Sequence, residues 1–185
     1  MEESLKGRLL VATPGLVDPN FDRTVVLMME HSDEGAIGLV LNRPGPLPVE
    51  SPFPEWAELA APPAAIFYGG PVVAGTVVTL ARSTDPDMHP EHWIPLFGDI
   101  GVVNVRLDPE ESGPGLDEVR VFSGYAGWAA GQLEGEIAGG GWFVVDADAE
   151  DAFTPAPEEL WGAVLRRQRG RLRIFAACPP DPSAN

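Results

Sequence analysis

The sequence predicts an α+β protein with a mixed or mainly antiparallel sheet. Short apolar runs of strand length outnumber the segments with helical character, and the first two well-defined strands precede any helix. The 21 glycines and 20 prolines are scattered between these runs, which indicates many short elements joined by tight turns. The 185 residues suit one domain over 1–185 with a continuous core.

The best-defined unit is a hairpin of two buried strands. Residues 24–29 and 36–41 are near-continuous apolar runs rich in Val, Ile and Leu. Such runs are typical of strands that are covered on both faces. The acidic turn at 32–35 is short, which favours antiparallel pairing. Pro44 ends the second strand because proline has no amide donor for the ladder.

The other elements are predicted from the same patterns. An apolar run at 8–13 ends at Pro14, and seven prolines between 44 and 63 leave room only for a short helix. The helix at 158–168 has Pro157 near its start, arginines in its last turn and Gly170 beyond. We predict strands over 8–13, 24–29, 36–41, 65–68, 72–81, 102–107, 119–122 and 142–145, helices over 55–61, 129–137 and 158–168, and an irregular loop over 82–95.

The charge distribution argues against direct nucleic-acid binding. The formal net charge is -16, and five of the twelve basic residues lie between 166 and 173, so the rest of the chain is more acidic still. Such a body repels phosphate backbones. The arginine run is interpreted as a solvated helix end. No apolar run approaches the roughly 20 residues that span a bilayer, and a single cysteine excludes an internal disulfide, so we expect a cytoplasmic protein and no membrane partner.

Polar residues gather at the ends of the two hairpin strands. Arg23 precedes the first strand, and Asn42 and Arg43 close the second. Antiparallel pairing would place these three at one rim of the sheet, where they could bind a ligand. Glu30 and His31 close the first strand, but adjacent strand residues point to opposite faces, which favours a capping role over shared acid–base chemistry.

Residues 122–128, FSGYAGW, are predicted as a strand that enters a glycine-bearing turn and opens a helix. Backbone amides at such a turn could hold an anion or a carbonyl oxygen. Gly124, Tyr125, Gly127 and Trp128 are therefore candidate ligand-binding residues. The alternative is that the glycines allow tight packing while the aromatic side chains fill the core, and the lack of a GxGxxG or P-loop pattern favours this alternative.

No metal or cofactor is expected. His89 and His92 flank Glu91 like half a metal site, but the helix that makes an HExxH site specific is missing. Cys178 lacks a glycine elbow or a helix N-terminus that would activate a thiol nucleophile. No catalytic residue is assigned.

Several motifs in one order resemble the AlgH/YqgE family across nearly the whole chain: VATPGLVDPNFDRTVVLMMEH, GAIGLVLNRP, YGGPV, FSGYAGWAAGQLEGEI and the closing DPSAN. The resemblance implies an α+β fold in which a bent, bifurcated, mainly antiparallel sheet forms a pseudo-barrel with helices packed outside. It also implies a cytosolic protein whose biochemical activity is not established, with one namesake associated with transcriptional regulation. The chain departs from the family at Leu80 and Ala81, where the family tends to show a Leu-His pair.

The leading functional interpretation is a non-enzymatic binding or regulatory protein that uses a protein partner or a small ligand without contacting DNA. The alternative is an enzyme or a protein that binds a small anion or metabolite, using Arg23, Asn42, Arg43 and the turn at 123–128. The sequence specifies neither the ligand nor the oligomeric state.

Overall fold

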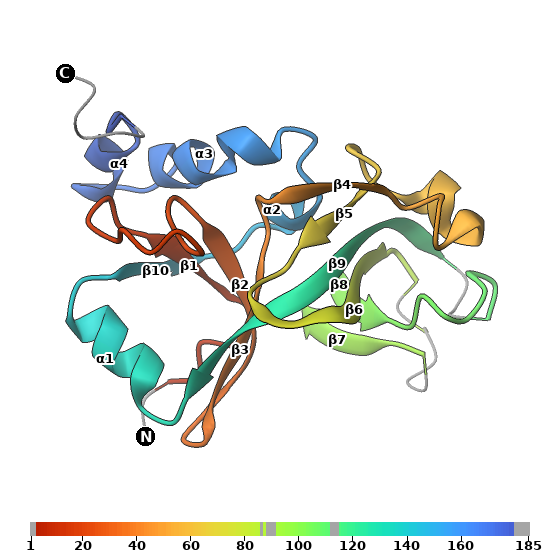
Figure 1. The fold of residues 1–185 in the computed structure, drawn as a ribbon, viewed down its shortest axis with the longest axis horizontal. Coiled ribbons are helices and arrows are strands. Elements are labelled where there is room, and N and C mark those ends of the chain that lie inside the picture. The colour runs from red at the N-terminus through yellow and green to blue at the C-terminus, as the bar shows by residue number, and fades with distance from the viewer. Residues whose placement is uncertain (1–2, 86, 88–91, 112–114, 180–185) are drawn as a thin grey trace.

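A bent sheet with helices on its outside forms the body of the molecule (Figure 1). The structure is a computed structural model that describes residues 3–85, 87, 92–111 and 115–179. Within these residues ten strands join in the order β10-β1-β2-β3-β9-β6-β8-β7, with β4 and β5 on a branch. The strands are β1 (Arg8–Ala12), β2 (Val25–Ser32), β3 (Gly35–Val40), β4 (Pro44–Pro48), β5 (Ala65–Tyr68), β6 (Val72–Ser83), β7 (Ile94–Phe97), β8 (Ile100–Val103), β9 (Leu116–Ala129) and β10 (Trp142–Asp146). The helices are η1 (Pro54–Leu59), α1 (Gln132–Ala138), α2 (Ala149–Phe153), η2 (Pro157–Glu159), α3 (Leu160–Arg166) and α4 (Leu172–Phe175).

The predicted hairpin is confirmed. β2 and β3 pair antiparallel, with Val26 opposite Val40 and Ser32 opposite Gly35. The ladder shifts register between Met28 and Glu30, so a bulge bends β2 near its C-terminal end. Beyond this bulge Glu30 pairs with Ile37, so the ladder continues to the hairpin turn.

The sheet divides along β9, the longest strand in the part of the chain that the structure describes. Residues 126–129 of β9 pair antiparallel with β3, whereas its N-terminal part pairs antiparallel with β6 and, at Phe122 and Ser123, parallel with β5. Gly124 lies at the division with a φ of 74°. An added Cβ at Gly124 would lie 2.5 Å from the carbonyl oxygen of Gly70. Two backbones therefore cross here at a distance that only glycine permits.

Three apolar clusters lie on the two faces of this sheet. The inner cluster fills the concave side and includes Phe67, Phe122, Phe153 and Trp161. Strands β1 to β3 alternate between this cluster and a second one beneath α1, so both of their faces are covered, as their apolar runs predicted. The third cluster packs η1 against the outer face of β6, β8 and β9.

The fold class is confirmed as α+β with a bent, bifurcated, mainly antiparallel sheet and external helices. Several element boundaries were wrong. The helix at 55–61 is the 3₁₀ helix η1, the strand at 102–107 is the shorter β8, and the strand at 119–122 is the middle of β9. The helix at 129–137 begins later, at Gln132, and the helix at 158–168 divides into η2 and α3. Residues 86 and 88–91 of the predicted loop at 82–95 lie outside the described residues. Among the rest, β6 extends into the start of this segment and β7 begins near its end, so it is a loop only in part.

Candidate ligand-binding site

The concave side of the sheet holds an open apolar pocket of about 380 Å³. Strands β2, β3, β9, β6, β8 and β7 all contribute to its lining, and this is also their order in the sheet. The apolar lining includes Met29, Ile37, Leu39, Val78, Leu96 and Val102. Most of these side chains also pack on the inner cluster, so the pocket is the open end of the core. Small-molecule sites in proteins have about this volume and are often found in the mouths of barrels.

The segment that precedes β1 closes the ring between the first and last of these strands. The amide of Gly7 donates to the carbonyl of Met28 in β2 at 2.8 Å. On its other side, an added Cβ on Gly7 would lie 3.1 Å from Cβ of Phe97 in β7. Lys6, next to Gly7, consequently lines the mouth of the pocket.

His31 fixes this segment in place. The amide of Leu5 donates to Nδ1 of His31 at 3.1 Å, and Oγ of Ser4 donates to the His31 carbonyl at 3.2 Å. Because Nδ1 accepts a hydrogen bond, the ring proton lies on Nε2, which bonds Oε1 of Glu134 at 2.6 Å. His31 thus has a structural role, as the sequence favoured.

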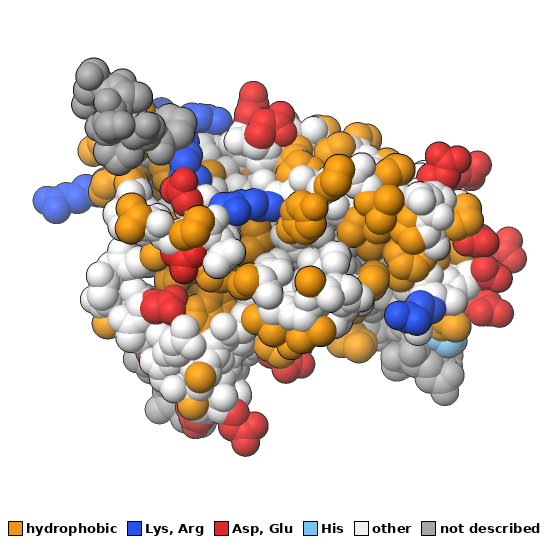
Figure 2. Space-filling view, in the orientation of Figure 1, with side chains coloured by type: hydrophobic (Ala, Val, Ile, Leu, Met, Phe, Trp, Pro, Cys, Tyr) orange, Lys and Arg blue, Asp and Glu red, His pale blue; other side chains and the backbone are white. Residues whose placement is uncertain are grey.

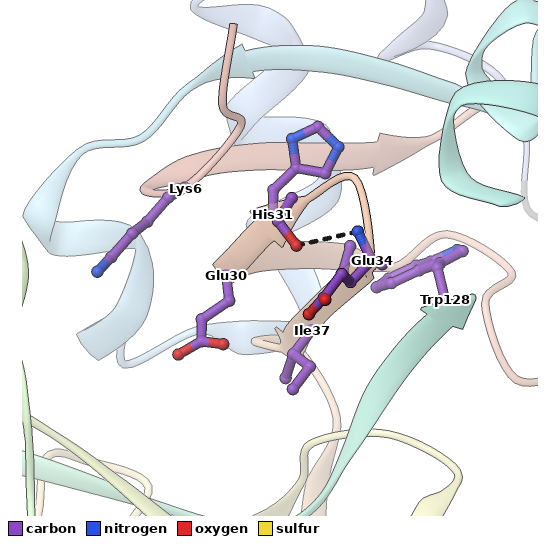
Figure 3. A pocket seen from close by; sticks show the side chains of 9 residues that line it. Lys6, Glu30, His31, Glu34, Ile37 and Trp128 are labelled. Atoms are coloured by element: carbon purple, nitrogen blue, oxygen red, sulfur yellow. Dashed lines mark hydrogen bonds between the residues drawn. The ribbon is translucent and has the colours of Figure 1, made fainter. Parts of the chain in front are cut away.

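A second, more polar hollow of about 450 Å³ adjoins the apolar pocket (Figure 3). Lys6, Glu30 and Ile37 line both hollows. Figure 3 shows Lys6 and Glu30 extending from neighbouring segments into the open space, while the His31 ring turns away from Glu30. Within the described part of the chain, neither the Lys6 ammonium nor the Glu30 carboxylate makes a hydrogen bond or ion pair. The mouth of the apolar pocket therefore carries one free cation and one free anion among the described residues.

The predicted rim residues lie together, but at the other end of the hairpin from the pocket. Nδ2 of Asn42 donates to the carbonyl of Arg23 at 2.9 Å, and Oδ1 of Asn42 accepts from the amide of Val25 at 3.0 Å. Arg43 donates to the carbonyls of Pro19 and Asp22. The predicted proximity of Arg23, Asn42 and Arg43 is confirmed.

The guanidinium of Arg23 is also engaged within the fold. It lies 3.9 Å from the centroid of the Trp161 ring and donates to the carbonyl of Cys178 at 2.9 Å. These contacts fasten the segment after α4 to the start of β2. The rim residues thus hold the chain together here, and a ligand-binding role for them stays a prediction.

The predicted elbow at residues 122–128 was wrong. These residues belong to the uninterrupted strand β9, and Ile37 and Ala36 of β3 lie opposite Gly127 and Trp128. The amides of Gly127 and Trp128 therefore belong to a sheet and not to a helix N-terminus. The glycines suggested a turn, but the positive φ of Gly124 bends the strand without ending it.

The four candidate residues of this segment have different surroundings. Gly124 is buried at the division of the sheet, and Trp128 is 5% exposed and donates from Nε1 to Glu136 at 3.0 Å. Tyr125 lines the apolar pocket, and Gly127 is exposed. Only Tyr125 of the four contributes to the pocket.

A buried arginine was missed by sequence reasoning. Arg120 in β9 is 1% exposed, and its guanidinium donates to the carbonyls of Ala61, Pro62, Ala152 and Thr154. It also lies 4.3 Å from the ring centroid of Phe67. Burial lowers the pKa of Arg120 to about 10, although the charge of Glu118 opposes this shift. Arg120 joins the segment before β5 to α2.

One member of the arginine run is likewise structural. The guanidinium of Arg167 binds both carboxylate oxygens of Asp151, at 2.5 and 2.6 Å, and Asp151 is 4% exposed. The hydrogen bond to Asp151 raises the pKa of Arg167. The interpretation of the run as a solvated helix end is wrong for this residue.

Neither His92 nor Cys178 is among the described residues that line the apolar pocket. His89 lies outside the described residues. Among the residues that are described, no three His, Cys, Asp or Glu side chains are grouped so as to hold a metal ion, and no helix is long and apolar enough to cross a membrane. Cys178 is half-buried and packs against the inner cluster.

Acid should weaken the attachment of the N-terminal segment. The hydrogen bond with His31 holds the pKa of Glu134 below its ordinary value of 4.5. A carboxyl group whose pKa is lowered by folding stabilises the fold at pH values above its ordinary pKa. This stabilisation is lost as the pH falls through the lowered pKa. We expect Glu134→Gln to lower the free energy of unfolding at neutral pH, by an amount that shrinks below about pH 4.5. Urea unfolding at a series of pH values measures this.

The exposed Glu50 supplies the control substitution for this experiment. Glu50→Gln makes the same chemical change at an exposed position and should change the free energy of unfolding little. A constant difference between the wild type and Glu134→Gln down to acid pH would contradict the assignment.

Comparison with known proteins places this architecture in a family. The profile of the family described as AlgH-like matches residues 9–173. A UPF0301 protein of Streptomyces avermitilis is 47% identical over 185 residues, covering 98% of this chain and 96% of the relative. A UPF0301 protein of Thermobifida fusca is 43% identical over 191 residues, with coverage of 98% and 96%.

Two solved structures share the fold. A crystal structure of a Corynebacterium diphtheriae protein superposes with a TM-score of 0.88 at 33% identity, covering 96% of this chain and 94% of that one. The solution structure of the AlgH protein from Pseudomonas aeruginosa gives a TM-score of 0.69 at 31% identity, with coverage of 97% and 96%. The chain belongs to the AlgH-like family.

Proposed function

We propose that this chain is a non-enzymatic cytoplasmic binding protein that holds a small apolar molecule in the open end of its pseudo-barrel. The observation that carries the proposal is the apolar pocket of about 380 Å³, lined in ring order by six strands and by Lys6. The protein would have a regulatory role if ligand binding in this pocket changed its contact with a protein partner. This role would need no direct contact between the protein and DNA.

The setting of the pocket supports binding of a ligand with an apolar body. Its wall continues the inner cluster, whose side chains are fixed by close packing, so the cavity is largely formed before a ligand arrives. Transfer of an apolar molecule from water to this wall is favourable by about 25 cal/mol per Å² of apolar surface buried. The polar groups at the mouth could orient one end of the ligand.

Fluorescence of the neutral apolar probe N-phenyl-1-naphthylamine tests the proposal. We expect saturable binding to the wild-type protein. Thr76 is half-buried and lines the pocket from β6, so Thr76→Trp should fill the space and weaken probe binding by tenfold or more, about 1.4 kcal/mol.

Ala74→Trp is the matched control, because Ala74 is exposed on the same strand and lies outside the pocket. It should bind the probe like the wild type. The proposal fails if the folded wild type shows no saturable binding, or if both tryptophan variants, with native melting temperatures, bind equally well.

A further inference from the structure

We infer that the ligand is an α-amino acid with a large apolar side chain. The side chain would occupy the apolar pocket, the α-ammonium group would pair with Glu30, and the α-carboxylate would pair with Lys6. This inference rests on the proposed function and adds the chemical class of the ligand.

The first support is the pair of free charges at one mouth. Lys6 and Glu30 both line the apolar pocket and the polar hollow beside it, and both are exposed (Figure 3). They form no ion pair with each other or with another described residue. Two opposite charges that leave each other unpaired beside an apolar wall are complementary to a zwitterion with an apolar body.

The second support is that both charges are carried by fixed backbone. Glu30 lies opposite Ile37 in the β2–β3 ladder, which directs both side chains to the same face. The backbone of Lys6 is held on both sides by hydrogen bonds, from the amide of Gly7 to the carbonyl of Met28 and from the amide of Leu5 to Nδ1 of His31. A ligand would therefore meet two charges whose main-chain positions are already set, and only the side-chain tips must be ordered.

The overall charge disfavours the simpler alternatives. A ligand with a carboxylate and no ammonium group would be repelled by a protein of net charge -16, whose acidic side chains are spread over the face seen in Figure 2. An amine without a carboxylate would meet Lys6 with like charge. The free hydroxyl of Tyr125, which makes no hydrogen bond to a described residue, offers a further polar contact on the pocket wall.

Four competitors with the same phenyl body separate the head groups. Phenylalanine, phenethylamine, 3-phenylpropanoate and 3-phenylpropanol are each titrated against bound N-phenyl-1-naphthylamine. We expect phenylalanine to displace the probe about tenfold more tightly than either singly charged compound, since it makes one more charge-assisted hydrogen bond. Equal displacement by all four, or by none, overturns the inference but leaves the proposed function standing as long as the probe itself binds.

Charge variants assign the contacts. Glu30→Gln should weaken phenylalanine and phenethylamine about tenfold while sparing 3-phenylpropanoate, and Lys6→Gln should weaken phenylalanine and 3-phenylpropanoate instead. The double variant Lys6→Glu with Glu30→Lys should recover much of the phenylalanine affinity, because a zwitterion can bind in the reversed sense.

Asp33→Asn is the control, since Asp33 is exposed in the same hairpin and lines neither hollow. It should leave all four affinities unchanged. If every variant, Asp33→Asn included, changes phenylalanine affinity alike, general electrostatics are responsible and the pairing with Lys6 and Glu30 is wrong. If the probe fails to bind the wild type, the proposed function itself falls.

Discussion

Replacement of Arg120 by methionine is expected to lower the free energy of unfolding by about 2–4 kcal/mol. The side chain is buried, and its hydrogen bonds satisfy carbonyl groups from two segments that are distant in sequence, before β5 and around the end of α2. Methionine can fill the space but cannot donate to these carbonyls, and each buried acceptor left without a donor costs about 1–3 kcal/mol. Equilibrium unfolding in urea measures the loss.

Arg106→Met is the matched control, because it makes the same chemical change at an exposed position. Its effect should stay within about 0.5 kcal/mol. If the two variants unfold at the same denaturant concentration with the same slope, the carbonyl cluster around Arg120 does not contribute to stability.

Gly124→Ala is expected to destabilise the fold by about 2–5 kcal/mol. The residue has a φ of 74°, and its new Cβ would lie 2.5 Å from the carbonyl oxygen of Gly70. A left-handed backbone costs about 1–2 kcal/mol for a residue other than glycine, and forcing the crossing backbones apart adds the strain of overpacking. Thermal and urea unfolding both report this change.

Gly127→Ala tests whether the effect belongs to the crossing or to the segment. Gly127 is three residues further along β9, and an added Cβ there would make only ordinary contacts, at 3.6 Å to Val72 and 3.7 Å to Tyr125. The change should cost less than about 1 kcal/mol. If the two substitutions destabilise the fold equally, the close crossing at Gly124 is not what makes this position sensitive.

The hairpin was predictable because its signal is local. Two apolar runs of strand length and a short turn determine β2 and β3 without reference to the rest of the chain. The same reasoning placed Arg23 beside Asn42, since antiparallel pairing brings the start of one strand to the end of the other. What these residues contact across the fold, Trp161 and Cys178, has no local signal.

The course of β9 could not be read from the sequence for a physical reason. The glycines at 124 and 127 are typical of a turn. Whether the segment forms a turn or a bent strand depends on the backbone at Gly70, which is distant in sequence and crosses β9 here. The burial of Arg120 could not be predicted either. A charged residue between the apolar Val119 and Val121 of a strand is expected to face solvent. In the fold the side chain of Arg120 lies on the same face of β9 as Phe122 of the inner cluster, where it contacts Ala152 of α2.

The proposed binding site could be predicted from the sequence only in part. Glu30 was noted as a strand-end charge and Tyr125 as a candidate, but Lys6 lies in a segment without a secondary-structure pattern. Its place at the mouth follows from contacts of Gly7 with β2 and β7, which are distant in sequence. A pocket whose lining comes from several strands of one ring can be located only once the tertiary structure is known.

An amide NMR titration with N-phenyl-1-naphthylamine tests the central claim most directly. If the open end of the pseudo-barrel is the binding site, the shifts should concentrate at Ile37, Thr76, Val102 and Tyr125, which line the pocket from four different strands. The region around Asn42 at the other end of the hairpin should change little. Shifts that centre on Asn42, or an unchanged spectrum at saturating probe, would contradict the account.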